Sequence, residues 1–340
     1  MKKTLWWILG ILLSPVLLFL ILTILIYLPP VQNWAVDKVA TVASEKTGMQ
    51  IAVDRVRLSF PLDLAVDGVL VRQRDSLTAQ LDTVAAVERL VVDVRLWPLL
   101  NQKVVISQLE VTNTRLNTMQ LVAAARVKGS FSRLSLYSRG IDLSAETVEL
   151  NGACLEEAAI DVALNDSVPE DTTTTENRWV INLDQLTVRQ SDVALHMPGD
   201  TMSVAAHFGS LAVRQVMADL GNQLYSVGSV DWDNGALRYD QNFAPHIEGL
   251  DPSHIDLSNI NIGIDSIRYS MMPPPMGTLS MVVRQVALRE QSGLQITHLS
   301  GAVKLADGKL SLPAFRLKTP ESDVLVTKML VQVLRHSASA

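Results

Sequence analysis

Residues 227–240 read VGSVDWDNGALRYD, two runs of alternating apolar and polar residues on either side of an Asn-Gly pair. An Asn-Gly pair in this setting is a strong signal for a two-residue β-hairpin turn, because both residues readily adopt a positive φ angle. With Asn234 and Gly235 at the tip, the large apolar side chains of both runs fall on one face of the hairpin and the charged ones on the other. The cross-strand pairs predicted in this way are Trp232 with Leu237 and Val230 with Tyr239.

Five further positions show the same change of phase, where the apolar residues switch between odd and even positions at a pair of turn-forming residues. These predicted hairpin tips are Asn113-Thr114, Asn151-Gly152, Gln190-Ser191, Asp265-Ser266 and Asp307-Gly308. The pairs that they predict include Leu186 with Leu195, Val188 with Val193, Ile262 with Tyr269, Ile264 with Ile267, and Leu305 with Leu310. The tips with Gly at the second position are the clearer signals, since Gly accepts a positive φ without steric cost.

Alternation with a period of two residues dominates the chain from Ile51 almost to its end, and helical spacing is scarce after Gly48. The sequence therefore predicts a mostly β protein built from repeated antiparallel hairpins. An antiparallel sheet with one apolar face must cover that face, and the helices are too few to do so. The pattern leaves two solutions open: a sandwich or barrel with a closed core, or a curved, taco-like groove whose aliphatic wall is filled by hydrocarbon chains. The aromatic content of 5% weakly favours lipid tails, because pockets for small ligands usually use aromatic side chains.

The amino-terminal segment predicts a transmembrane helix. From Leu5 to Leu28 the sequence has no charged residue, and a helix of this length spans about 36 Å, enough for a hydrocarbon core of roughly 30 Å. Lys2 and Lys3 precede the run, so the positive-inside rule places the amino terminus in the cytoplasm and the body outside it. The alternative is a cleaved signal peptide, but the run exceeds the usual apolar length of about 7 to 15 residues and no small-residue cleavage site follows.

Residues 31–48 show helical spacing of apolar residues, and Gly48 is placed to end the helix. The polar face of this segment is not rich in Lys or Arg, as a membrane-surface helix would be. We therefore expect a short amphipathic helix that caps the open edge of the sheet beginning near Met49.

Composition and motifs argue against several classes of function. A net charge of −6 and the lack of a basic block argue against nucleic-acid binding. Cys154 is the only cysteine, which excludes internal disulfides and thiolate metal sites, and the six histidines show no metal-ligand spacing. The sequence has no phosphate-binding glycine motif and no catalytic signature, so we expect no cofactor, no metal site, no catalytic residue and no enzyme activity.

The segment from Trp34 to Asn117 resembles the amino-terminal part of the AsmA/TamB superfamily. The residues that carry this resemblance are Thr47-Gly48 at the end of a helix, Phe60-Pro61, Gly68-Val69, Trp97-Pro98-Leu99-Leu100 and the run LEVTNTRLN at 109–117. The predicted anchor and the later hairpins fit the same family. These landmarks are patterns of apolar residues and turns, and none of them is catalytic.

Membership would imply a single-pass inner-membrane protein of a Gram-negative type envelope, with a periplasmic β-groove that carries phospholipid between the inner and outer membranes. It would also imply a part in outer-membrane biogenesis and protein secretion, as in the translocation and assembly module, with a TamA-type outer-membrane barrel as partner. TamB proteins are typically longer and carry a carboxy-terminal domain that meets this partner, so we expect a truncated reading frame or a short family member. From another class, the alternative is a structural assembly module with a closed β core that binds a protein of the outer-membrane assembly machinery.

The predicted organisation has six segments. They are the cytoplasmic tip and transmembrane anchor (1–30), the capping helix (31–48), the first part of the groove (49–164), a flexible polar loop (165–177), the second part of the groove (178–323) and an uncapped carboxy-terminal tail (324–340). The residues expected to line a lipid groove are Leu186, Val188, Val193, Leu195, Val230, Trp232, Leu237, Ile262, Ile264, Ile267, Leu305 and Leu310.

Overall fold

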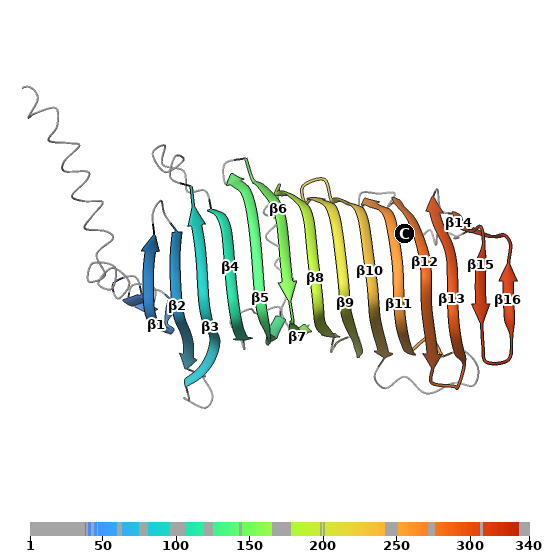
Figure 1. Ribbon diagram of the computed structural model, residues 1–340, viewed down its shortest axis with the longest axis horizontal. Coiled ribbons are helices and arrows are strands. Elements are labelled where there is room, and N and C mark those ends of the chain that lie inside the picture. The colour runs from blue at the N-terminus through green and yellow to red at the C-terminus, as the bar shows by residue number, and fades with distance from the viewer. Residues whose placement is uncertain are drawn as a thin grey trace, which may run out of the picture.

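The computed structural model describes residues 38, 40, 41, 44, 45, 47–59, 63–74, 81–95, 106–118, 125–142, 145–164, 178–197, 199, 201–241, 251–270, 276–306 and 309–332. These residues form a mostly β structure, a single sheet of 17 strands. The strands stand side by side along the long axis of the molecule, with β1 at one end and β16 at the other (Figure 1).

The strands are of very unequal length. They are β1 (Gln50–Ser59), β2 (Asp63–Arg74), β3 (Leu81–Val94), β4 (Ile106–Asn117), β5 (Ala125–Asp142), β6 (Thr147–Glu156), β7 (Ala159–Leu164), β8 (Val180–Met197), β9 (Met202–Asp219), β10 (Leu224–Gln241), β11 (His254–Ser270), β12 (Met276–Glu290), β13 (Gln295–Ala306), β14 (Lys309–Leu312), β15 (Phe315–Lys318), β16 (Asp323–Val326) and β17 (Met329–Gln332). Strands β5, β8, β9 and β10 have 18 residues each, about 60 Å of extended chain, far beyond the usual strand.

Most neighbouring strands are antiparallel and follow one another in the chain, from β1 to β5 and again from β8 to β13. The exception lies between them. Strands β6 and β7 lie end to end beside β5 and are antiparallel to it, but both pair with β8 in parallel. The sheet itself continues from β7 to β8, although the predicted polar loop at 165–177 lies outside the described residues.

Five of the six predicted hairpin tips are wrong. The Asn234-Gly235 pair lies inside β10, and residues 224 to 241 run as one strand between β9 and β11. The pairs Asn113-Thr114, Asn151-Gly152, Gln190-Ser191 and Asp265-Ser266 likewise lie inside strands β4, β6, β8 and β11. Only Asp307-Gly308 joins two strands, and there the predicted pairing of Leu305 with Leu310 is confirmed.

At three of these five tips the change of phase has another cause, a left-handed residue in the middle of the strand. Asn234 has a φ of 52°, Asn113 of 47° and Gln190 of 46°, conformations that Asn adopts more readily than most residues. One such residue turns the following side chains to the other side, bends the strand and strengthens its twist, as a β-bulge does. The sequence therefore shows the same phase change as a hairpin, while the strand continues.

The left-handed residues, together with the residues opposite them on the neighbouring strands, form a line across the sheet that we call the crease. Each member lies at a position where the regular pairing of residues between neighbouring strands is interrupted. In chain order the members are Asp54, Gly68, Glu88, Asn113, Ser132, Glu157, Gln190, Gly209 and Asn234. Every member is polar or glycine. At Gly209 a Cβ atom would lie 2.7 Å from the Asn234 Cβ, so only glycine fits beside the bend of the next strand.

The segment before β1 contacts the amino-terminal edge of the sheet. The described residues between 38 and 47 have helical backbone geometry, and the Gly48 N–H donates to the Ser44 carbonyl at 2.9 Å. Gly48 has a φ of 70°, the geometry of a glycine that ends a helix. The Ser44 hydroxyl in turn accepts a hydrogen bond from the Ile51 N–H on β1, at 3.1 Å. The predicted transmembrane segment lies outside the described residues.

Candidate functional site

The apolar side chains of the long strands gather on one face, which we call the inner face. Directly paired residues of an antiparallel ladder point to the same side of a sheet, so each row of paired residues shares a face. On one side of the crease the rows are Leu186, Val213, Val230, Ile264 and Met281, and Val188, Leu211, Trp232, Ile262 and Val283. On the other side they are Val193, Ala206, Leu237, Leu257 and Leu288, and Leu195, Val204, Tyr239 and Ile255.

The structure brings the predicted lining residues together by pairings that differ from the expected ones. Val188 does not face Val193; it pairs with Leu211 on β9, while Val193 pairs with Ala206 farther along the same strand. Trp232 pairs with Ile262. A further row joins the remaining residues, since Val227 pairs with Ile267, Ile267 with Leu279, Leu279 with Leu305 and Leu305 with Leu310.

The inner face lies on the inside of the bend at the crease. Trp232 and Gly235 lie on opposite sides of Asn234 in the strand. The indole ring of Trp232 nevertheless lies over Gly235, where an added Cβ atom would be 2.3 Å from the indole Nε1. The ring also lies against Phe208, with 5.1 Å between ring centroids, and its N–H donates to the His207 carbonyl at 3.3 Å. Side chains from the two sides of the crease thus meet over its inner surface.

The inner face is most tightly packed near β11 and β12. Ile260, Val283 and Val286 form a buried cluster. The residues packed against this cluster come from both sides of the crease and are Trp232, Leu237, Leu257, Ile262, Met281 and Leu299. Elsewhere many inner residues, such as Leu186 and Val193, are only half-buried.

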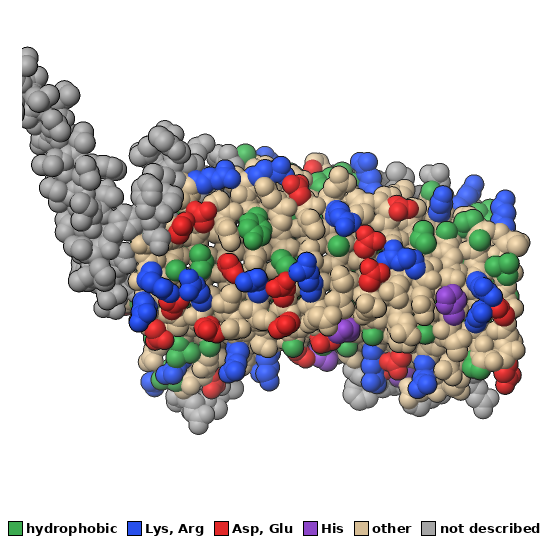
Figure 2. All heavy atoms as spheres, viewed as in Figure 1, with side chains coloured by type: hydrophobic (Ala, Val, Ile, Leu, Met, Phe, Trp, Pro, Cys, Tyr) green, Lys and Arg blue, Asp and Glu red, His purple; other side chains and the backbone are tan. Residues whose placement is uncertain are grey.

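The outer face is polar. Figure 2 shows Lys, Arg, Asp and Glu side chains spread along it over the whole series of strands. Many form ion pairs between strands: Arg214 with Asp231 at 3.1 Å and Arg189 with Glu156 at 3.0 Å on neighbouring strands, and Arg284 on β12 with Asp233 on β10, across β11, at 2.8 Å. Exposed pairs of this kind contribute roughly 0 to 1 kcal/mol each, so their main effect is to keep this face hydrated.

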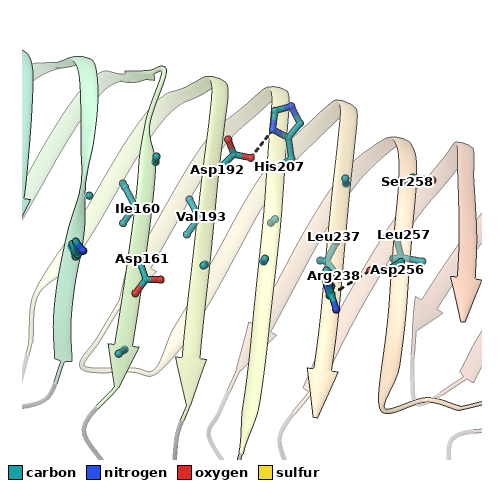
Figure 3. Close-up of a pocket in the computed structure, with 18 of the residues that line it drawn as sticks. Ile160, Asp161, Asp192, Val193, His207, Leu237, Arg238, Asp256, Leu257 and Ser258 are labelled. Carbon is teal, nitrogen blue, oxygen red and sulfur yellow. Dashed lines mark hydrogen bonds and ion pairs between the residues drawn. The ribbon is translucent and has the colours of Figure 1, made fainter. Parts of the chain in front are cut away.

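A shallow hollow of about 920 Å³ lies on the outer face between β5 and β11 (Figure 3). Alanines and charged side chains alternate along its lining, and Asp192 and His207 point toward one another there, with 2.8 Å between carboxylate and Nδ1. Figure 3 also shows Arg238 beside Asp256 at its other end. The sequence analysis did not predict this hollow. Its small residues, such as Ala194, Ala205 and Ala236, alternate along the strands with the apolar residues of the inner face.

A buried polar network, also missed from the sequence, holds the ends of β11 and β12. The side chains of Asp251 and Glu290 are 1% and 2% exposed. The Asp251 N–H donates to Glu290 Oε1 at 2.6 Å, and His254 Nδ1 lies 2.8 Å from Asp251 Oδ2. Burial alone would raise the pKa of Glu290, but hydrogen bonds from Ser292 and from backbone N–H groups lower it below its usual value.

Metal-ligand clusters and cysteine chemistry can be assessed only in the described part of the chain. Within this part, no group of three or more His, Cys, Asp or Glu side chains is arranged to bind an ion. Cys154 is a free, half-buried thiol whose pKa is raised, first by burial and then by the neighbouring Glu156 carboxylate. No helix in the described part of the chain is long and apolar enough to cross a membrane.

No protein-family model matches this sequence, and no curated protein matches it. The case for a function therefore depends on the geometry of the sheet.

Proposed function

We propose that this chain is an inner-membrane-anchored periplasmic protein of the AsmA/TamB type, whose inner face carries the acyl chains of phospholipids. The observation that carries the proposal is the set of mainly aliphatic rows on the inside of the crease, which join β8 to β14 without a charged residue in any of the rows. The charged outer face supports the same proposal, because it leaves the inner face as the apolar one.

An acyl chain suits such a surface physically. Aliphatic side chains bind hydrocarbon through the hydrophobic effect, at roughly 25 cal/mol per Å² of buried apolar area, without directional contacts. A lipid tail can therefore move from one row of side chains to the next with little resistance. Half-buried inner residues such as Leu186, Val193 and Leu195 offer apolar surface for this purpose.

The proposed function also involves the inner and outer membranes, between which the phospholipid would move. In this proposal residues 5–28 anchor the chain in the inner membrane, the body lies in the periplasm, and phospholipid moves between the inner and outer membranes in support of outer-membrane biogenesis. A TamA-type barrel protein would be the partner at the outer membrane. The proposal involves no cofactor and no enzymatic step.

A second candidate is an assembly module with a closed core that binds another protein. The cluster of Ile260, Val283 and Val286 favours it, because side chains from both sides of the crease already fill the inner surface there. If this packing extended along the whole sheet, no room would remain for lipid.

Purification of the full chain in mild detergent, followed by mass spectrometry of the extracted lipids, tests the proposal. We expect co-purifying phospholipid in amounts comparable with the protein. A lipid-free preparation that is folded by circular dichroism would contradict the groove and favour the assembly module.

A further inference from the structure

The crease changes in character along the sheet. Between β8 and β9, and between β9 and β10, the pairing of residues resumes beyond the crease in the same register as before it. The register instead shifts on both sides of Gly235 where β10 meets β11. Further shifts follow between Ser258 and Ile262 of β11 and between Val283 and Leu288 of β12. An extra residue on one strand bends that strand and increases its twist, so the sheet is irregular from β10 to β13.

The floor of the crease is filled at β10 and β11. Successive pairs of the sheet place one residue of each strand from β8 to β11 along this floor: Ser191, Phe208, Gly235 and Ile260. At β10 the Trp232 ring lies over Gly235, which has no side chain of its own. At β11 the floor continues with Ile260, which is 2% exposed. The chain's own side chains therefore occupy the floor where the register shifts begin.

The two sides of the crease meet over β12. Val283 and Val286 lie on opposite sides of a register shift, yet both belong to the buried cluster and are 6% and 7% exposed. Leu257 and Ile262 of β11, also separated by a register shift, pack against the same cluster. Side chains from both sides of the crease thus contact one another and cover the buried residues. The inner face is closed at these strands.

The inner face is more accessible at β8 and β9. Leu186 and Val213 are half-buried, and neither belongs to the cluster around Ile260 or packs against it. Val188 is 7% exposed, but Leu186, two positions before it, stays half-buried. The row that begins with Leu186 and Val213 runs to Met281, which packs against the cluster. One continuous row therefore links an open section of the inner face to a closed one.

We propose that the cluster of Ile260, Val283 and Val286, with the side chains packed against it, is a closed gate in the lipid path. This inference rests on the proposed function and adds a regulatory step to it. With the gate closed, acyl chains occupy the inner face at β8 and β9 and stop before β11. An acyl chain advances past β11 and β12 when the two sides of the crease separate there.

Opening this gate exchanges one set of apolar contacts for another. The cluster and the side chains packed against it are all hydrophobic, so an acyl chain that enters replaces their contacts with one another. Met281 is unbranched and adapts its shape readily. The Trp232 N–H bond to the His207 carbonyl, at 3.3 Å, holds the ring in its closed position. Without lipid, the closed cluster keeps its apolar surface away from water.

A phosphatidylethanolamine that carries a photoreactive diazirine on one acyl chain locates lipid without altering the protein. The full chain is purified in mild detergent with this probe, irradiated and digested, and mass spectrometry identifies the residues that carry adducts. We expect adducts on Leu186 and Val213. With an open form populated at about 10% or less, adducts on Leu257 and Met281 should be at least about tenfold fewer. Adducts on Gln185, exposed on the outer face, give the background.

Two matched double variants test whether the cluster excludes the lipid. Ile262→Ala/Val283→Ala shortens two directly paired residues of the gate, and adducts should then appear at β11 and β12. Val148→Ala/Ile181→Ala makes the same two changes at a direct pair of β6 and β8, neither of which belongs to the cluster or packs against it. In this control the gate should stay free of adducts. Circular dichroism checks that both chains are folded, and the wild-type map decides if the first is not.

Equal adducts on the open and closed sections of the wild-type chain would overturn the gate and leave the lipid groove standing. The gate would also be wrong if the first double variant kept β11 and β12 free of adducts, or if the control variant acquired them there. A wild-type chain without adducts above background on any inner residue would contradict the proposed function itself, and the gate with it.

Discussion

The inner and outer faces of the sheet are made by the same strands, and residues one position apart on a strand meet opposite environments. On the inner face, Leu186 and Val188 belong to rows of apolar side chains that continue from strand to strand. On the outer face, Arg189 pairs with Glu156 at 3.0 Å and stays exposed. The effect of a substitution should therefore depend on which face its position in the strand presents, and not on residue type alone.

The largest effect on stability is expected in the buried cluster of the inner face. Ile260→Ala should lower the free energy of unfolding by about 2 to 5 kcal/mol, because it leaves a cavity next to Val283 and Val286. Ser258, on the same strand, is exposed on the outer face, and Ser258→Ala should change stability by no more than about 0.5 kcal/mol. Urea denaturation followed by circular dichroism measures both. Equal losses would mean that the two faces are not packed differently.

The crease should be the next most sensitive region. A Cβ atom at Gly209 would lie 2.7 Å from both the Cβ and the carbonyl oxygen of Asn234, so Gly209→Ala should cost about 1 to 3 kcal/mol. Gly140 in β5 has nothing within 4 Å of the corresponding position, so Gly140→Ala is a matched control. We expect the control to be neutral or slightly stabilising in the same denaturation experiment. A neutral Gly209→Ala chain would show that the strands can separate at the crease.

A smaller, pH-dependent effect is expected at Glu290. Its pKa is lowered in the folded chain from an ordinary value of 4.5, so its contribution is present at pH values above 4.5 and is lost as the pH falls through the native pKa. The stability of the wild-type chain should therefore decrease below about pH 4.5. The Glu290→Gln chain cannot titrate at this position and should show a flatter profile, with lower stability at pH 7 because the acceptor for Ser292 is weakened. If urea titrations at several pH values gave the same pH dependence of stability for the wild-type and Glu290→Gln chains, Glu290 would not be the source of the pH dependence.

The smallest effect is expected for an ion pair on the outer face. A double-mutant cycle with Arg189→Ala and Glu156→Ala should give a coupling energy below about 1 kcal/mol, because both side chains contact solvent. High salt should reduce it further. A coupling of several kcal/mol would mean that the outer face contributes as much to folding as the inner one.

Several features of the fold could be predicted from the sequence. The mostly β character follows from the period-two alternation. The hairpin at Asp307-Gly308 was correct because a short turn between two strands is a local feature. The positions at which the apolar phase changes at Asn113, Gln190 and Asn234 were also found correctly, and each is a residue with positive φ.

Whether the chain turns back or continues as one strand at those positions could not be predicted, for a physical reason. A type I′ hairpin turn and a bend inside a strand both use a residue such as Asn234 in the left-handed conformation, and both reverse the apolar phase. The distinction depends on whether strands β9 and β11 lie on either side of the whole segment, which is decided by pairing between distant residues. The parallel pairing of β7 with β8 and the contact between Asp251 and Glu290 depend in the same way on distant parts of the chain.

The most direct test of the lipid groove compares one aspartate on each face. Leu186 is half-buried on the inner face and lies outside the cluster around Ile260, while the neighbouring Gln185 is exposed and pairs with Arg214 on the outer face. We predict that Leu186→Asp remains folded and loses its co-purifying phospholipid, because an unpaired charge would have to be desolvated beneath each acyl chain, at a cost of several kcal/mol. Gln185→Asp should keep the lipid content of the wild-type chain. If both variants retain phospholipid equally by mass spectrometry, or if Leu186→Asp unfolds the chain outright, the inner face is not a lipid path.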